Sequence, residues 1–318
     1  MTLQRAVQSL LQLLRQRVLG QEEITEQVVA TLLCGSHALL TGAPGVAKTT
    51  LVRTLACALG CGYKRIQFTP DLTPFDILGG ETIRFNNDSS DRKSFEFLPG
   101  PIFTHFLLAD EINRASPRTQ SALLEAMQER QVSLGGITHS LPKPFYVFAT
   151  QNPIESEGTF PLPDAQLDRF LMDIHVPYPD FEAELAIATL SPAGHEVSPL
   201  EEASQLLEAH KSVVNIQVPE TVLKGIVRLV RSTRPEDSSL SFVKEFLDYG
   251  ASPRASQALV LASQALAFIW GENQVSPEMV IKMAPPVLRH RCVPNFKALA
   301  QRKDANSLVK WVVNECIM

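Results

Sequence analysis

The chain reads GAPGVAKT over residues 42–49, directly after the short apolar segment 37–41 and just before the helical segment 50–59. A loop between a strand and a helix can turn successive backbone N–H groups inward to hold an anion. The dipole of the helix that follows adds favourable positive charge. In such a loop Lys48 would reach the β- and γ-phosphates of a nucleotide, and the Thr49 hydroxyl would ligate Mg²⁺. The stretch therefore predicts a nucleotide-binding α/β domain.

One residue of this loop departs from the usual pattern, in which glycine precedes the lysine. Ala47 stands in that place, whereas the loop keeps Gly42 and Gly45. If the backbone there needs a positive φ, alanine is costly; if the residue is already helical, alanine is harmless. A simple glycine-proline turn before a helix is the competing interpretation, and the strand–loop–helix context argues against it.

Short apolar runs alternate with helical patterns on both sides of the loop. Buried strands are expected at residues 37–41, 63–68, 103–110, 145–150 and 170–176. Helices are expected at residues 3–18, 22–34, 50–59 and 116–130. Buried strands that alternate with helices predict a mostly parallel sheet covered on both faces.

Two segments interrupt the alternation and are expected to form hairpins. Residues 83–97 carry a tip at 86–91 that is rich in turn-forming residues, and residues 131–141 turn at Gly135 and Gly136.

The composition changes at residues 176–179, which read VPYP and break the regular pattern. Beyond them no buried strand is expected. Ser252 and Ser276 each precede a proline, as at helix starts. Helices are expected at residues 181–190, 201–209, 220–232, 242–249, 254–270, 277–283 and 306–316. The chain is therefore predicted to comprise an α/β domain over residues 1–178 and a helical domain over residues 179–318.

Two adjacent carboxylates follow one of the expected strands. Residues 106–111 read FLLADE, which places Asp110 and Glu111 at the carboxyl edge of the sheet, where α/β proteins bind ligands. Asp110 would hold Mg²⁺ through water, and Glu111 would orient or deprotonate an attacking water. A solvated acidic turn is the alternative, and the position of this strand after a phosphate loop favours catalysis.

Three further polar residues are candidates for the same chemistry. Asn152 ends a buried run, where its amide would bridge the water and the γ-phosphate; a plain Asn-Pro turn is the alternative. Arg169 precedes the last strand, and would either reach a neighbouring subunit's nucleotide or pair with Asp168 on the surface. Arg254 lies in the first turn of a helix, where a cation opposes the helix dipole unless a phosphate accompanies it.

The composition argues against several classes of protein, namely nucleic-acid-binding, membrane and secreted proteins. The formal net charge is −5, which argues against non-specific binding to nucleic acid or to an anionic membrane. The first twenty residues lack a signal-peptide pattern, and no uncharged run is long enough to span a bilayer, so a cytoplasmic location is expected. The cysteines fit no disulfide or metal framework and are interpreted as packing residues. They are Cys34, Cys57, Cys61, Cys292 and Cys316.

In this order, the motifs resemble those of the AAA+ ATPases, and most closely those of the MoxR family. The segments that carry the resemblance are RIQFTPDL at 65–72, FLPGPIF at 97–103, ADEINR at 109–114, QSALLEAMQERQ at 120–131, ATQNP at 149–153, LDRF at 167–170 and ASPR at 251–254. The similarity covers nearly the whole chain. MoxR proteins also tolerate alanine at the position of Ala47.

The resemblance implies a sheet of order 5-1-4-3-2 followed by a helical lid. It implies that Asn152 is the first sensor, Arg169 the finger that acts on a neighbour, and Arg254 the second sensor. Glu111, Asn152, Arg169 and Arg254 are thus the expected catalytic residues, and Thr49 and Asp110 the expected Mg²⁺ ligands. The residues expected to bind ATP are Val18, Leu19, Gly20, Gly42, Ala43, Pro44, Gly45, Val46, Ala47, Lys48, Thr49 and Thr50.

The family further implies a homo-oligomeric ring, usually a hexamer, with the two hairpins as family insertions. It implies Mg²⁺-dependent ATP hydrolysis that drives chaperone-like remodelling, assembly or metal-centre maturation of a protein client. A protein with a von Willebrand factor A domain is the expected partner. A nucleic-acid motor is one alternative, although residues 131–140 contain no Lys or Arg. A nucleotide-gated scaffold with little turnover and a magnesium-chelatase-like subunit are the others.

Overall fold

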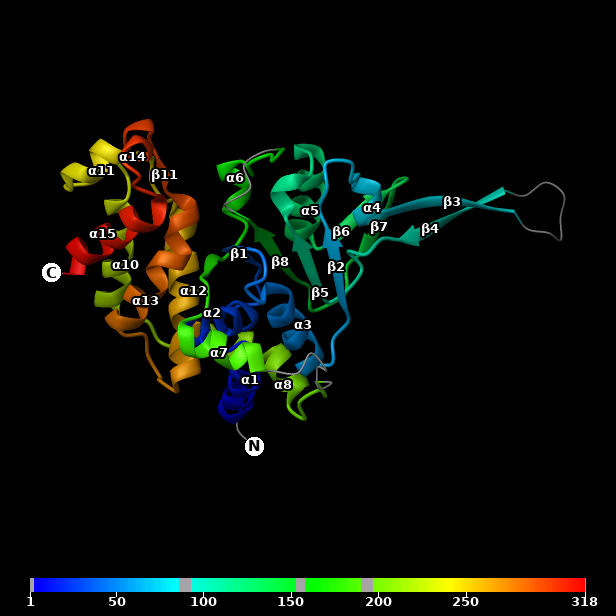
Figure 1. The fold of residues 1–318 in the computed structure, drawn as a ribbon, viewed down its shortest axis with the longest axis horizontal. Helices are drawn as coiled ribbons and strands as arrows, with labels where there is room; N and C mark the ends of the chain where they lie inside the picture. The colour runs from blue at the N-terminus through cyan, green and yellow to red at the C-terminus, as the bar shows by residue number, and fades with distance from the viewer. Residues whose placement is uncertain (1–2, 86–92, 153–157, 190–196, 318) are drawn as a thin grey trace.

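The computed structural model describes residues 3–85, 93–152, 158–189 and 197–317 (Figure 1). A five-stranded sheet lies at its centre, with the strand order β2-β5-β8-β1-β9 and every neighbouring pair parallel. Its strands are β1 (Ala38–Gly42), β2 (Tyr63–Gln67), β5 (Phe106–Asp110), β8 (Tyr146–Gln151) and β9 (Met172–Val176). When these five strands alone are numbered, the order is the predicted 5-1-4-3-2.

Helices cover both faces of this sheet, which explains why its central strands are almost entirely apolar. On one face, Leu108 and Phe148 pack in a core shared with α1 (Leu3–Arg17), α2 (Glu22–Leu33) and α3 (Lys48–Ala58). On the other face, the alternate residues Leu107 and Val147 pack against α5 (Pro117–Glu129). The predicted α/β sandwich is confirmed.

Beyond residue 179 the chain is mainly helical, and the helices from α10 (Glu220–Ser232) to α15 (Ala305–Ile317) gather beside the sheet (Figure 1). Among them, α12 (Pro253–Trp270) packs against α2, α10 and α13 (Pro277–Leu288), whereas α8 (Ala203–Glu208) packs on α1 and α2. The longer helices of this half are α7 (Phe181–Thr189), α10 (Glu220–Ser232), α12 (Pro253–Trp270), α13 (Pro277–Leu288) and α15 (Ala305–Ile317). Its shorter ones are α8 (Ala203–Glu208), α9 (His210–Val213), α11 (Ser241–Phe246) and α14 (Phe296–Ala300). Within the described ranges, no helix combines the length and apolar character that crossing a membrane requires.

No buried strand was expected beyond residue 179, and the two short strands that the described residues form there are largely exposed or half-buried. The strand β10 (Leu247–Tyr249) pairs antiparallel with β11 (Val293–Pro294), so the helix expected to reach residue 249 ends at Phe246. Helical periodicity does not reveal a partner strand more than forty residues away along the chain. The helix α13 runs past its expected end at Met283, because the last turn buries Val287 and Leu288 although two prolines precede them.

Two hairpins interrupt the α/β part, and the first of them projects from it (Figure 1). The first pairs β3 (Gly79–Phe85) with β4 (Lys93–Pro99) and begins four residues earlier than predicted; its expected tip lies outside the described residues. The second pairs β6 (Gln131–Leu134) with β7 (Ile137–Ser140) and turns at the predicted glycines. Phe97 of the first stacks on His139 of the second, with ring centroids 3.8 Å apart, so the two hairpins contact each other.

Candidate functional site

A cavity of about 360 Å³ lies at the carboxyl edge of the sheet, where β1 passes through the glycine-containing loop into α3. The loop runs close to the neighbouring strand: a Cβ atom at Gly42 would lie 2.3 Å from the carbonyl oxygen of Val176. Only glycine fits at that place. The cavity is lined by Pro44, Gly45, Ala47, Lys48, Thr49, Thr50, Arg65, Gln67, Asp110, Glu111, Thr150 and Asn152.

The backbone of Ala47 decides between the two alternatives that its identity left open. Its φ is 61° and its ψ is 17°, in the left-handed region, immediately before α3 begins at Lys48. An L-residue in this conformation brings its Cβ close to the following carbonyl oxygen, which costs about 1–2 kcal/mol. The alanine is therefore the costly choice at this position, and the strain lies within the phosphate loop.

Replacing Ala47 with glycine is expected to raise the free energy of unfolding of the nucleotide-free chain by about 1 kcal/mol, because glycine adopts a positive φ without strain. Urea denaturation followed by circular dichroism measures the change. Ala258→Gly is the matched control: this alanine lies inside α12, so the same substitution there is expected to lower stability by about 1 kcal/mol. Equal losses in both variants would contradict the strain at Ala47.

Lys48 folds back onto its own loop. Its Nζ donates to the carbonyl oxygens of Gly42 at 2.6 Å and Ala43 at 3.2 Å. Partial burial lowers the pKa of the ammonium group, and the negative charges of Asp110 and Glu111 oppose that shift. The ammonium is thus held in the cavity among carbonyl oxygens, which phosphate oxygens can replace as acceptors.

Asp110 is held from two neighbouring strands. Its Oδ2 accepts hydrogen bonds from Nε and Nη2 of Arg65 on β2, at 2.9 and 2.6 Å, and its Oδ1 accepts one from Thr150 on β8 at 2.5 Å. Arg65 and Thr150 were missed by the sequence analysis. The available signal was the strand order, because β2 and β8 flank β5 on its two sides.

Glu111 follows β5 in a left-handed conformation, with φ 56° and ψ 50°. Strained backbone of this kind clusters at functional sites. Its Oε2 accepts hydrogen bonds from Gln67 at 2.7 Å and from Arg114 at 2.9 Å, and its backbone N–H donates to Thr150 at 2.8 Å. Both carboxylates of the site are therefore oriented and charge-balanced by neighbouring side chains.

The donor set fits Mg²⁺. Thr49 and Asp110 bring a hydroxyl and a carboxylate into one cavity, and Mg²⁺ in nucleotide sites takes one or two such oxygens together with phosphate oxygens and water. Asn152 is buried at the end of β8 and lines the same cavity, whereas Pro153 of its motif lies outside the described residues.

Arg169 and Arg254 do not line this cavity. Arg169 donates from Nη1 to the carbonyl oxygen of Leu124 on α5 at 2.6 Å. The alternative of a surface pair with Asp168 was wrong, because Asp168 pairs instead with Arg291 at 2.6 Å. Arg254 is exposed in the first turn of α12. The structure thus gathers nine predicted residues in one cavity and leaves both arginines outside it. The nine are Pro44, Gly45, Ala47, Lys48, Thr49, Thr50, Asp110, Glu111 and Asn152.

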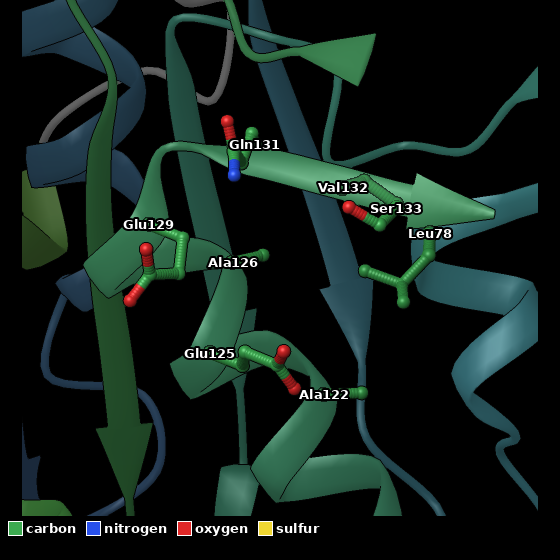
Figure 2. A pocket seen from close by; sticks show the side chains of 8 residues that line it. All are labelled: Leu78, Ala122, Glu125, Ala126, Glu129, Gln131, Val132 and Ser133. Atoms are coloured by element: carbon green, nitrogen blue, oxygen red, sulfur yellow. The ribbon is translucent and has the colours of Figure 1, made fainter. Parts of the chain in front are cut away.

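Gly20, one of the residues expected to bind ATP, lines a different cavity, of about 520 Å³, where α2 and β9 meet α13 and α15. A third cavity, of about 120 Å³, lies between α5 and β6 (Figure 2). The side chains of Glu125 and Glu129 line it together with Gln131, Val132 and Ser133 of β6. Its lining residues include two carboxylates and no cation, so this cavity is unsuited to phosphate.

Two family models match the chain. Residues 37–172 match the model described as ATPase family associated with various cellular activities (AAA), and residues 240–310 match the AAA lid domain.

Curated relatives match over most of the chain. It is 44% identical over 298 residues to Chaperone MoxR1 of Mycobacterium tuberculosis, covering 93% of this chain and 78% of the relative. It is 40% identical over 300 residues to YeaC of Bacillus subtilis, covering 93% and 90%. It is 31% identical to Protein MoxR of Paracoccus denitrificans, covering 86% and 84%. A crystal structure of a protein from Cytophaga hutchinsonii superposes with a TM-score of 0.87 at 36% identity, covering 98% and 94%.

Proposed function

The chain belongs to the MoxR family of AAA+ ATPases, and from that premise we propose that it hydrolyses MgATP to remodel or mature a protein client. One observation carries the proposal: Lys48, Thr49, Asp110, Glu111 and Asn152 line a single cavity at the carboxyl edge of the sheet. The name of one relative, Chaperone MoxR1, supports the chaperone-like part. Assembly and metal-centre maturation are the specific forms of this role that we propose.

Each residue of the cavity has a place in the proposed reaction. The loop N–H groups and Lys48 bind the phosphates, and Thr49 and Asp110 hold Mg²⁺. The bound Mg²⁺ supplies charge neutralisation at the transferred phosphoryl group. Glu111 accepts a proton from the attacking water or orients it, and Asn152 fixes the water against the γ-phosphate.

The proposed active form is a homo-oligomeric ring, usually a hexamer. Arg169 lies outside its own chain's cavity, so it suits the nucleotide of a neighbouring subunit. Residues 1–178 form the proposed nucleotide-binding domain and residues 179–318 the proposed lid, whose Arg254 meets the γ-phosphate when the lid closes. The ring is proposed to act in the cytoplasm, the location expected from the sequence. Its proposed partner carries a von Willebrand factor A domain, which rests on the family resemblance alone.

A nucleotide-gated scaffold with little turnover is the second candidate. One observation favours it: Asp110 is paired with Arg65 and Glu111 with Arg114, so both carboxylates of the site are engaged by cations. Multiple turnover of MgATP by the wild-type ring would decide against this candidate. A nucleic-acid motor gains no such support, because the hairpin β6–β7 carries no Lys or Arg.

Replacing Lys48 with alanine tests the site itself. The variant is expected to bind MgATP roughly 10- to 150-fold more weakly, the value of one hydrogen bond between a cation and a charged phosphate. Isothermal titration calorimetry measures the dissociation constant. Lys64→Ala is the matched control, because Lys64 is exposed on β2 and does not line the cavity. Unchanged affinity in Lys48→Ala would place the nucleotide elsewhere.

A further inference from the structure

The residue before the proposed finger is held by the helical half of the chain. Asp168 ends the short helix α6 (Asp164–Leu167), and its two carboxylate oxygens accept hydrogen bonds from two separate places beyond residue 250. Oδ1 accepts from Nε of Arg291 at 2.6 Å, and Oδ2 accepts from the hydroxyl of Ser252 at 3.2 Å. We name these three residues the Asp168 latch.

The Arg291 side of the latch is deeply buried. Arg291 lies in the 3₁₀ turn η2 (Arg289–Arg291) after α13, and 4% of its side chain is exposed. Its Nη2 donates to the carbonyl oxygen of Phe170 at 2.8 Å and its Nη1 to that of Leu171 at 3.0 Å. Moving Asp168 away from the buried guanidinium of Arg291 would leave a buried charge uncompensated. These hydrogen bonds therefore hold residues 168–171 in a fixed position relative to Arg291. Residues 168–171 therefore follow η2 when η2 moves.

The Ser252 side of the latch is close to the proposed second sensor. Ser252 precedes α12 directly, and Arg254 lies in the first turn of the same helix. A shift of this helix start when Arg254 meets the γ-phosphate would displace the Ser252 hydroxyl and hence the carboxylate of Asp168. Arg169 is the next residue along the chain, and in this structure its guanidinium is directed back to Leu124 of its own subunit.

We propose that the Asp168 latch positions Arg169. The nucleotide bound beside Arg254 in one subunit would then determine whether Arg169 of that subunit is directed toward the site of its neighbour. This inference rests on the proposed function. Asp168, Arg291 and Ser252 are positioning residues, because none of them lines the cavity proposed to hold the nucleotide. The chain thereby contains a contiguous connection from its own lid to the site of the next subunit.

Subunit mixing separates this role from a structural one. An acceptor that carries Arg169→Ala keeps an intact site of its own, and a donor that carries Glu111→Gln keeps an intact finger. Mixed in equal amounts, the two are expected to regain ATP hydrolysis at acceptor sites next to donor fingers. The latch changes Ser252→Ala and, separately, Asp168→Asn are then placed in the donor. Because the donor's own site is already inactive, any loss reports on the finger that it offers.

Either latch change is expected to lower the regained rate by roughly 5- to 150-fold, the range of coupling between linked sites. Thermal midpoint and MgATP affinity of the Ser252→Ala donor are expected to match those of the parent donor. Ser252→Thr, which keeps the hydroxyl, is expected to restore the rate. Ser276→Ala is the control for loss of a serine hydroxyl before a helix-start proline, because Ser276 does not contact Asp168. Its side chain caps α13, so the thermal midpoint of this variant is expected to fall while the regained rate stays unchanged.

Two outcomes would overturn the inference in distinguishable ways. If donors with Ser252→Ala and donors with Asp168→Asn both activate the acceptor fully, the latch does not position Arg169. The site shared between subunits would still be supported. No regained hydrolysis even with the parent donor would rule out the site shared between subunits, and with it the ring on which the latch depends.

Discussion

Replacing Glu111 with glutamine is expected to lower steady-state ATP hydrolysis by roughly 10²- to 10⁴-fold while MgATP binding stays within a few-fold of wild type. Glutamine keeps the size of the side chain and one acceptor oxygen for Gln67 and Arg114, so the geometry of the site is preserved. It cannot take a proton from the attacking water. Phosphate release and titration calorimetry, measured on the same preparation, separate the two effects.

The matched control is Glu125→Gln, which removes an exposed carboxylate from α5 at a distance from the phosphate loop and is expected to leave turnover unchanged. Turnover within about threefold of wild type in Glu111→Gln would remove Glu111 from its role, since general-base losses are far larger. If the role holds, the variant accumulates in the ATP-bound state. That state is the one in which a slowly released client would be captured for identification.

The phosphate loop was the part of the site that the sequence could predict most directly. A strand, a loop with Gly42 and Gly45, and a helix that begins at Lys48 are consecutive along the chain, so local patterns suffice. The five buried strands were likewise visible as short apolar runs. The sequence left open whether Ala47 is strained, because that depends on its backbone torsion rather than on its identity.

The partners of the carboxylates were beyond local patterns. Arg65 reaches Asp110 across 45 residues, and Gln67 reaches Glu111 across 44. Both contacts arise because β2 lies beside β5 with Gln67 opposite Asp110, a register that no propensity in either strand specifies. Arg291 and Asp168 are still farther apart, at 123 residues, and their pairing requires the helical half to dock on the sheet. Such contacts follow from topology, which the family resemblance supplied for the strands but not for side chains.

The ion pairs of Asp110 with Arg65 and of Glu111 with Arg114 bear on how nucleotide and Mg²⁺ enter the site. Arg65 donates two hydrogen bonds to Oδ2 of Asp110. A Mg²⁺ ion bound directly to that oxygen would compete with the guanidinium, whereas an ion bound to Asp110 through a water molecule would not. Arg114 and Gln67 likewise occupy one oxygen of Glu111 and leave the other for water. These contacts orient the two acids in the nucleotide-free chain.

Replacing Arg169 with alanine is expected to lower turnover by roughly 10³- to 10⁵-fold, the contribution of an arginine finger to phosphoryl transfer, with little change in MgATP affinity. The site of each chain contains Lys48 and Arg65 as its cations, and Arg169 of the same chain is directed to Leu124 instead. Arg169 can therefore act on a γ-phosphate only at the site of another subunit, where it would add a cation to those that the chain holding the nucleotide supplies. Turnover per subunit in wild type should rise with protein concentration as subunits assemble, and in Arg169→Ala it should stay low throughout.

The matched control is Arg228→Ala, an exposed arginine on α10 whose loss removes the same charge and is expected to leave turnover unchanged. Sedimentation velocity on the same samples shows whether Arg169→Ala still assembles, which separates a lost finger from a lost interface. A concentration-independent rate in wild type, together with wild-type turnover in Arg169→Ala, would mean that each chain completes its own site. The nucleotide-gated or monomeric interpretation would then replace the ring, because the only argument that requires a neighbour is the position of this arginine outside its own cavity.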